Sequence, residues 1–394
     1  MQSMLQHHLN YPRMSSLRAI FAAVSIKMFG LSIFSVFIPI YLYTLNYSFR
    51  MVLSFFLMDH LFRVFITPIV GWLISKMGPV FGLTISAGVN VIMLLLLYTL
   101  PAHSWPLVII ASASAIAASL HFLSYYVDFA VSQKAGKTGR EVGNLSQMLI
   151  VVTSVGPLIG GLIGTYYGTA WLLATTIALV ILSMVPLINA HHPHVSHNFD
   201  LRKIPWRAMT PDLISAGGKS WDNRTANVIW PFTVFLLVGT YAKVGLLTAI
   251  SFLTVFVVAR LVTLRADRQG TQLLATGSYA SAGVHIVRIV AQTFASVVFV
   301  NLVAGIFNWV GQIPWQAQMY KNALATRPIE YLTAFTMIGD ISGVFFWALL
   351  LGSTFLVSMN QTIILAFVLG AVGVTLVPII SRSRIAAPLA ANAS

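Results

Sequence analysis

The chain has 394 residues, of which 58% are hydrophobic and 8% charged, and its formal net charge is +14. A soluble domain carries about 25% charged residues, so this composition excludes a soluble globular protein and indicates an integral membrane protein. The absence of cysteine excludes disulfides, thiolate metal sites and thiol catalysis.

Twelve apolar stretches follow one another along the chain. Each is long enough to cross the hydrocarbon core of a bilayer as a helix, which takes about 20 residues. Their unbroken apolar runs exclude the alternating pattern of a transmembrane β-barrel. The expected helices are 19–44, 51–74, 80–100, 106–127, 144–167, 169–190, 210–238, 245–264, 271–290, 292–313, 330–357 and 360–381. The sequence therefore predicts an all-α membrane protein with two six-helix bundles, 1–190 and 210–394, joined by a central loop at 191–209.

The positive charge is distributed unevenly between the two sides of the predicted bundle. One side carries Arg13, Arg18, Lys76, Lys134, Lys137, Arg140, Arg202, Lys203, Arg207, Arg265, Arg268, Lys321, Arg327, Arg382 and Arg384, whereas the other carries Arg50 and Lys243. Cytoplasmic loops are enriched in Lys and Arg, so we expect both termini in the cytoplasm and the protein in the plasma (inner) membrane. Topology explains the basicity, and no nucleic-acid partner is expected.

The two halves of the chain repeat one another at an offset of 192 residues. This offset relates Lys27 to Lys219, Pro39 to Pro231, Lys76 to Arg268 and Gly78 to Gly270. Each pair falls at the same place within its helix or loop, which indicates a duplicated six-helix unit. Transporters are often built from such repeats, with the substrate site between them.

Three segments resemble motifs of the major facilitator superfamily. They are GWLISKMGP at 71–79, TLRADRQGT at 263–271 and GPLIGGLIG at 156–164. The resemblance implies the twelve-helix fold of that family, a cavity lined by helices 1, 4, 7 and 10, and gating loops that contain Gly71, Gly78, Asp267, Arg268 and Gly270. Ser75 stands where the family has aspartate, and Thr263 replaces a leading glycine.

The motif glycines also have readings that do not depend on the family. Gly78 and Gly270 are expected to form tight turns at positive φ. The glycines of the third segment favour close packing between helices over a role in the export of a solute.

Ionisable side chains within the predicted helices are the main functional signal, because each is costly in a bilayer unless it is paired or faces water. Asp59 and Arg63 are four residues apart, so they are expected to form an ion pair on one helix face. Arg260 and Arg288 fall near helix ends, where long side chains reach the membrane surface. The remaining candidates for the solute site are Lys27, Lys219, Asp222 and Arg224.

Two helices carry polar stripes that cannot face lipid along their whole length. The seventh begins GGKSWDNRTANVIW and places Lys219, Asn223 and Asn227 on one face. The tenth carries Asn301, Asn308, Trp309 and Gln312. Such a face forms either interhelical hydrogen bonds or the wall of a cavity. We expect a cavity wall, with Lys27 and Lys219 as symmetric cations facing a shared aqueous space.

Asp340 is an isolated acid within the eleventh helix. Protonation is one way for a carboxyl group to remain buried, and pairing with a lysine or arginine is the other. Asp340 is therefore the candidate for proton coupling.

These features predict a secondary active transporter that moves a small solute by alternating access between the two halves. The candidate residues carry four cations, Lys27, Arg63, Lys219 and Arg224, against three acids, which suggests an anionic or zwitterionic solute. Efflux of amphipathic compounds is the alternative, followed by a receptor or an intramembrane enzyme on the same scaffold. We expect no enzyme activity, no cofactor and no metal, since no ATP-binding loop is present and the histidines of HHPHVSH lack the spacing of a zinc site. The expected partners are the lipid bilayer and the solute, and the protein is expected to be a monomer.

Overall fold

The structure is a computed structural model that describes residues 14–132, 153–188 and 198–385, with the backbone alone for 14–19 and for most of 252–268. No strand occurs in these residues. Nine of the described helices are long and apolar enough to cross a membrane. The all-α class predicted from the sequence is confirmed.

The first half of the chain begins with helix α1 (Met14–Phe34), which continues through a short 3-10 turn, η1 (Ser35–Phe37), into α2 (Ile38–Thr44). Pro39 lies in the first turn of α2, where its missing N–H is tolerated. The half continues with α3 (Phe49–Met77), α4 (Pro79–His103) and α5 (Leu107–Ser132), then a helical segment at 153–166, α7 (Thr169–Leu182) and α8 (Val185–Ile188).

The second half begins with the 3-10 turn η2 (Leu201–Lys203) and α9 (Trp206–Arg224). A π-helical turn, η3 (Thr225–Ile229), joins α9 to α10 (Trp230–Val238). The half then contains α11 (Tyr241–Val290), α12 (Phe294–Leu324), α13 (Pro328–Ser353), α14 (Met359–Leu376) and the 3-10 turn η4 (Val377–Arg382).

One predicted connection in this half is a kink in the structure, and another is helical. The segment α11 consists of two helices that meet at a kink at Gln269, so the eighth and ninth predicted helices are separate helices, as predicted. The tenth was predicted to end at residue 313, but α12 runs to Leu324 with Pro314 inside it. The segment after residue 313 contains proline and so resembles a loop in sequence, whereas packing against neighbouring helices keeps it helical.

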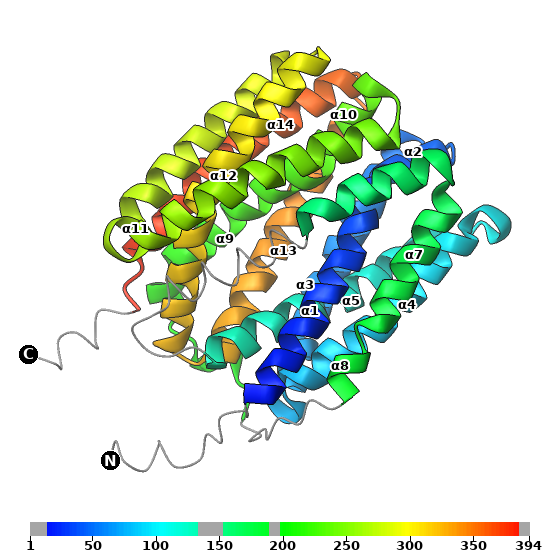
Figure 1. Ribbon diagram of the computed structural model, residues 1–394. Helices are drawn as coiled ribbons and strands as arrows, with labels where there is room; N and C mark the ends of the chain where they lie inside the picture. Colours follow the sequence, from blue (N-terminus) through cyan, green and yellow to red (C-terminus); the bar gives the residue numbers. More distant parts are fainter. Residues whose placement is uncertain (1–13, 133–152, 189–197, 386–394) are drawn as a thin grey trace, which may run out of the picture.

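The two halves lie side by side with their helices running in the same general direction (Figure 1). α13 of the second half packs against α3 and α5 of the first, and α9 packs against α13 and α14. We call the end of the bundle where α1 begins and η4 ends the terminal side, and the end that carries α2 and the C-terminus of α10 the far side.

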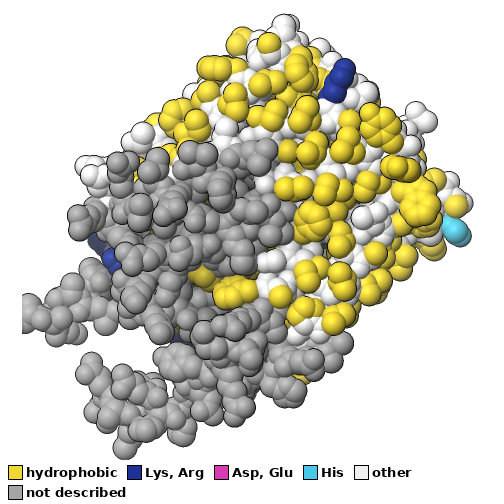
Figure 2. Space-filling model, in the orientation of Figure 1, with side chains coloured by type: hydrophobic (Ala, Val, Ile, Leu, Met, Phe, Trp, Pro, Cys, Tyr) yellow, Lys and Arg dark blue, Asp and Glu magenta, His cyan; other side chains and the backbone are white. Residues whose placement is uncertain are grey.

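The surface seen in Figure 2 is covered by hydrophobic side chains over most of its described area. Large apolar residues are exposed on several helices, among them Phe65 at 66%, Trp171 at 64% and Phe345 at 61%. Soluble proteins rarely expose contiguous apolar surface on this scale, and lipid-facing helices require it. The protein is therefore a multi-pass integral membrane protein.

Aromatic contacts join the two halves on the far side. The ring of Phe232 stacks on Phe49 at 5.5 Å between centroids and meets Tyr43 edge-on at 5.3 Å. Nearby, Arg50 donates a 2.7 Å hydrogen bond to the carbonyl of Thr354 and lies over the ring of Phe355. These contacts connect α2 and α3 to the second half and close this end of the interface.

A second set of contacts joins the halves on the terminal side. Phe129 of α5 lies 4.7 Å from Tyr320 of α12, measured between ring centroids. Gly71 of α3 lies against Thr333 of α13 and the ring of Phe199, which precedes η2. The two halves are thus in contact on both sides of the space between them.

Candidate functional site

A cavity of about 430 Å³ lies between the halves and is lined by residues of both; we call it the central cavity. Most of its lining comes from α3, α5, α9 and α13, with only Ile38 from the first predicted helix and no residue from the tenth, since Trp315 of α12 lies beyond its predicted end at 313. Helices 4 and 7 line it as the resemblance implied. Helices 2 and 11 occupy the places expected for helices 1 and 10, because α3 and α13 form the main contact between the halves.

The first half contributes an ion pair to this cavity from one face of α3. Arg63 Nη2 lies 2.6 Å from Asp59 Oδ2, as the four-residue spacing predicted. His60 Nδ1 donates to the carbonyl oxygen of Phe56 at 2.8 Å, so its ring is held by the helix backbone. Asp59 Oδ1 and Arg63 Nε have no partner among the described residues. Part of the hydrogen-bonding capacity of this pair is therefore unused.

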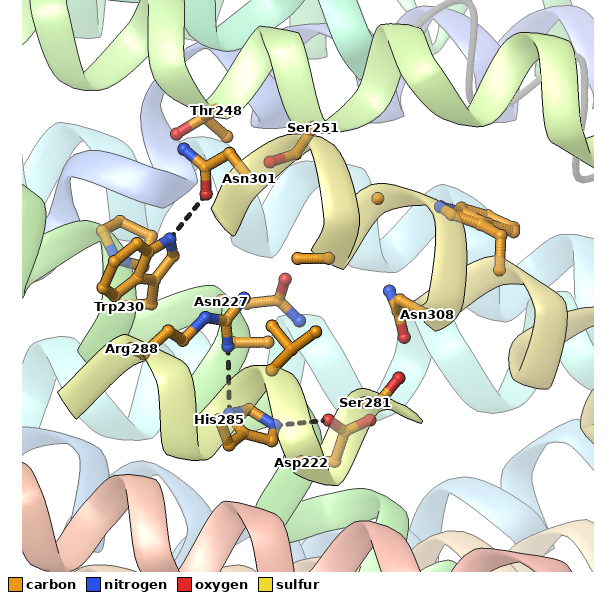
Figure 3. Close-up of a pocket in the computed structure, with 16 residues that line it drawn as sticks. Asp222, Asn227, Trp230, Thr248, Ser251, Ser281, His285, Arg288, Asn301 and Asn308 are labelled. Atoms are coloured by element: carbon orange, nitrogen blue, oxygen red, sulfur yellow. Dashed lines mark hydrogen bonds and ion pairs between the residues drawn. The ribbon is translucent and has the colours of Figure 1, made fainter. Parts of the chain in front are cut away.

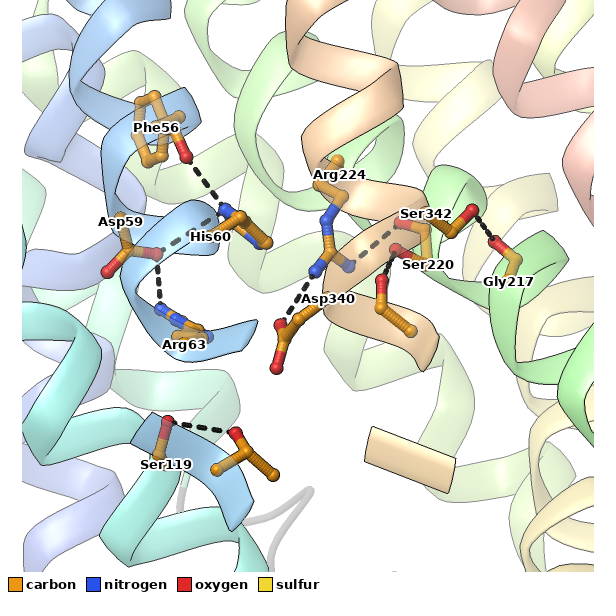
Figure 4. A network of polar contacts seen from close by, with 12 residues as sticks. Phe56, Asp59, His60, Arg63, Ser119, Gly217, Ser220, Arg224, Asp340 and Ser342 are labelled. Atoms are coloured by element: carbon orange, nitrogen blue, oxygen red, sulfur yellow. Dashed lines mark hydrogen bonds and ion pairs between the residues drawn. The ribbon is translucent and has the colours of Figure 1, made fainter. Parts of the chain in front are cut away.

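The second half contributes a matching pair from two helices (Figure 4). Arg224 Nη2 of α9 lies 3.5 Å from Asp340 Oδ1 of α13, and Arg224 Nη1 donates to the carbonyl of Ser220 at 3.0 Å. The distance of 3.5 Å is long for a charge-assisted hydrogen bond, which normally measures about 2.7–2.9 Å. Asp340 is therefore paired with an arginine, which is the alternative that the sequence left open, but the pair is loose.

A third charged pair lies on α9 at the wall of the central cavity. Lys219 lines this cavity, and its Nζ lies 2.7 Å from Asp222 Oδ2 and also donates to Asn308 Oδ1 at 3.2 Å. Both charged residues are buried, with Lys219 4% and Asp222 3% exposed. Asp222 and Asn308 face away from the central cavity into a second, smaller pocket.

This second pocket, of about 90 Å³, lies within the second half among α9, η3, α11 and α12; we call it the side pocket. His285 Nε2 lies 2.8 Å from Asp222 Oδ1, and His285 Nδ1 lies 3.0 Å from Arg288 Nη1 (Figure 3). The guanidinium of Arg288 also lies over the ring of Trp230 at 5.0 Å.

The side pocket corrects one sequence prediction and adds one residue. Arg288 was expected to reach the membrane surface, but it is 6% exposed and points inward. His285 was not singled out at all, although a histidine three residues before an arginine in an apolar helix is a visible signal. The spacing of three places both side chains on one face of α11.

The polar residues of the tenth predicted helix divide between two roles. Asn308 and Trp309 line the side pocket. Asn301 also borders it, but both ends of its amide are used between helices, because its oxygen accepts from Trp230 Nε1 at 2.7 Å and its nitrogen donates to the carbonyl of Leu247 at 2.9 Å. Gln312 lines neither cavity. The stripe thus serves as a pocket wall and as an interhelical hydrogen-bonding surface, and not as a wall of the central cavity.

Lys27 does not face the central cavity, contrary to the expectation of two symmetric lysines. It is 3% exposed, and its Nζ donates a 2.6 Å hydrogen bond to Ser86 Oγ of α4. Neither pocket includes Lys27 among its lining residues. The rotation of α1 about its axis is set by packing against α7 and α8, and this packing turns Lys27 into the first half.

The π-helical turn η3 lies between the two cavities. Asn227, within η3, lines both of them. Such turns occur frequently at functional sites, because the inserted residue redirects neighbouring side chains. Here the turn separates the charged residues of α9 from Trp230 and Pro231 at the start of α10.

Comparison with known proteins gives matches in structure alone. No protein-family model matches the chain, and no curated protein sequence matches it. The fucose:proton symporter of E. coli, in a variant crystal structure, superimposes with a TM-score of 0.65 over 94% of this chain and 99% of that chain, at 12% identity. A crystal structure of the same major facilitator transporter in its outward conformation gives a TM-score of 0.68 over the same shares, at 10% identity. The chain has the major facilitator fold.

Within the major facilitator fold, the motif glycines fulfil their predicted roles unequally. Gly78 joins α3 to α4 with φ 86°, as predicted. Gly270 does not have positive φ, and the bend at this place lies instead at Gln269, whose φ is −123°. The glycine-rich segment permits close packing between halves, since a Cβ on Gly161 would lie 3.1 Å from the Cα of Ala242. Gly71 lies in the terminal-side contact, whereas the side chains of Asp267 and Arg268 are outside the described residues.

Proposed function

We propose that this protein is a secondary active transporter that moves a small polar solute by rocking its two halves around the central cavity. The observation that carries this proposal is the arrangement of charged side chains from both halves around one cavity. Charged groups are costly within a bilayer and are retained where they bind substrates or ions. A cavity of about 430 Å³ lies in the size range of small-molecule sites.

The charge balance of the central cavity supports a solute without net charge. Arg63 pairs with Asp59, Arg224 with Asp340, and Lys219 with Asp222, which leaves no excess of either sign. The anionic solute suggested by the sequence depended on Lys27, which faces elsewhere.

The lining combines these polar pairs with aromatic rings. Phe122, Tyr126, Trp315 and Phe335 border the same space as the charged groups. Hydrogen-bonding groups between flat apolar surfaces suit a molecule that has both hydroxyl groups and an apolar face. We therefore infer a neutral polyhydroxy solute of monosaccharide size, and the structural neighbour described as a fucose symporter supports this class.

We infer proton coupling through Asp340. A proton on its carboxyl group would remove the charge that holds Arg224, and the 3.5 Å separation makes this pair the loosest of the three in the central cavity. Arg224 would then be released to bind the solute or to repack between the two conformations. The neighbour's description as a proton symporter supports this part of the proposal. We further propose a monomer in the inner membrane with both termini in the cytoplasm.

Ligand-induced thermal stabilisation of the purified protein tests the solute class, because a true ligand stabilises only the state that binds it. The panel would contain neutral monosaccharides, zwitterionic amino acids, monocarboxylates and amphipathic organic cations. We expect stabilisation by members of the first group, followed by uptake of the same compound into proteoliposomes driven by a pH gradient. Stabilisation by amphipathic cations alone, with increased drug tolerance of cells that overproduce the protein, would support efflux instead.

A further inference from the structure

The side pocket contains more positive than negative charge. Asp222 supplies one negative charge. Lys219, which contacts Asp222, and Arg288, which contacts His285, supply two positive charges, and His285 in turn contacts Asp222. His285 is neutral in this arrangement, because its Nδ1 accepts from Arg288 and its Nε2–H donates to Asp222. One positive charge therefore remains unbalanced in a buried site.

Arg288 is the cation without an acidic partner. Its guanidinium carries five N–H donors, and the described residues give it one hydrogen-bond acceptor, His285 Nδ1 at 3.0 Å. Its Nε has no partner among the described residues, although the side chain is only 6% exposed. The ring of Trp230 shields one face of the group. A buried guanidinium in this condition requires an acceptor of negative charge.

None of the other acids whose side chains the structure describes supplies that charge. The chain has nine Asp and Glu residues. Asp59 and Asp340 are in the central cavity, Asp128, Asp200, Asp212 and Glu330 line neither cavity, and Glu141 is outside the described residues. Asp267 is sixteen residues along α11 from Ser251 of the pocket, a distance of about 24 Å along the helix. Among the described acids, Asp222 alone reaches the side pocket.

The remaining lining of the pocket offers further polar groups around the same space. Asn227, Asn308, Ser251 and Ser281 border it, and Figure 3 shows the amide of Asn227 and the guanidinium of Arg288 directed into one interior. The volume of about 90 Å³ exceeds that of one water, whose share of liquid volume is about 30 Å³. The space is sufficient for a small ion with one or two waters, and it is too small for the proposed solute.

We propose that the side pocket binds one small monovalent inorganic anion, of the size of chloride, against Arg288. The anion balances the one positive charge that Asp222 does not balance. It accepts hydrogen bonds from the free N–H groups of the guanidinium and of the side-chain amides. Its site lies within the second half and not between the halves, so it is distinct from the solute site.

Thermal unfolding of the purified protein in detergent, without any transported solute, tests this proposal. Sodium chloride would replace sodium gluconate at constant ionic strength, since gluconate is too bulky for the pocket. We expect a saturable rise in Tm of about 2–4 °C for the wild type. Arg288→Gln should abolish the chloride effect, whereas Arg382→Gln, which removes an exposed arginine, should retain it.

A second variant keeps the test decisive if Arg288→Gln does not fold. Asn227→Asp places a fixed carboxylate of the same shape in the pocket beside Arg288. We expect this variant to be more stable than the wild type in gluconate and to lose its response to chloride. An equal Tm of the wild type in chloride and gluconate, or an undiminished chloride response in Asn227→Asp, would overturn the proposal. Either result would leave the proposed transport function untouched, because no solute enters the measurement.

Discussion

Lys219 Nζ lies 2.7 Å from Asp222 Oδ2, so a lysine that lines the central cavity and an acid that lines the side pocket form one ion pair. The same acid holds His285 through its other oxygen at 2.8 Å. Asp222 therefore connects α9 to α11, because one of its oxygens contacts Lys219 and the other contacts His285.

We predict that Asp222→Asn strongly destabilises the protein. The change leaves Lys219 buried without its counter-charge, and breaking a buried pair in this way costs about 3–5 kcal/mol. Thermal or chemical unfolding in detergent would measure the loss. Asp128→Asn is the matched control, because Asp128 is buried but pairs with no described residue. Combining Asp222→Asn with Lys219→Met should recover part of the stability, and failure of the double variant to recover any would contradict the pairing.

Asp340→Asn is expected to separate solute movement from the proton gradient. The amide keeps the shape of the carboxyl group but cannot exchange a proton, so uptake driven by a pH gradient should fall at least tenfold. Exchange of labelled for unlabelled solute across proteoliposomes, which needs no net proton movement, should persist. Asp200→Asn serves as control, because Asp200 lies in the segment before η2 and caps its backbone. Unchanged gradient-driven uptake in Asp340→Asn would remove Asp340 from the coupling role.

Gly71→Leu is predicted to favour the conformation open on the terminal side. A Cβ at this position would meet Thr333 and lie 3.0 Å from the ring of Phe199, so a larger side chain separates α3 from α13. The chain contains no cysteine, so a single Ala118→Cys substitution in the central cavity reports access directly. We expect labelling of this cysteine by a membrane-impermeant maleimide to increase from the terminal side. Gly88→Leu should leave the rate unchanged, because nothing lies within 4 Å of the added Cβ there.

On the far side, Phe232→Ala should have the opposite effect on access. Phe232 is 1% exposed and contacts Tyr43 and Phe49 of the other half, so its removal weakens the closure of this end. Maleimide labelling at Ala118→Cys should then increase from the far side, with a loss of stability of about 3 kcal/mol from the cavity created. Phe299→Ala, which removes a ring that is 63% exposed, is the control. Equal labelling in both variants would show that Phe232 does not hold the far side closed.

The terminal side is expected to face the cytoplasm. A green fluorescent protein joined after Ser394 should be fluorescent in bacterial cells, because this reporter folds in the cytoplasm and not after export in unfolded form. Alkaline phosphatase at the same position should be inactive. The opposite pair of results would reverse the membrane orientation inferred from the distribution of Lys and Arg.

The sequence by itself determined the class of the protein, most of its membrane crossings and one local ion pair. Apolar runs of sufficient length must lie in lipid, and residues four apart on one helix must be neighbours, so the pairing of Asp59 with Arg63 was predicted. The pairing of Lys219 with Asp222 was not predicted, although the same rule applies to their spacing. The tertiary structure decided which buried charges face which space. Arg224 meets Asp340, and Asp222 meets His285, across residues far apart in the chain.

The orientation of Lys27 and Arg288 illustrates the physical reason for this limit. Composition fixes the depth of a side chain in the membrane, but the rotation of its helix about its own axis depends on the neighbours against which the helix packs. Lys27 was expected to face the central cavity and instead donates to Ser86, whereas Arg288 was expected at the surface and lies in the side pocket. No local pattern distinguishes these outcomes, because both residues are single cations in apolar helices.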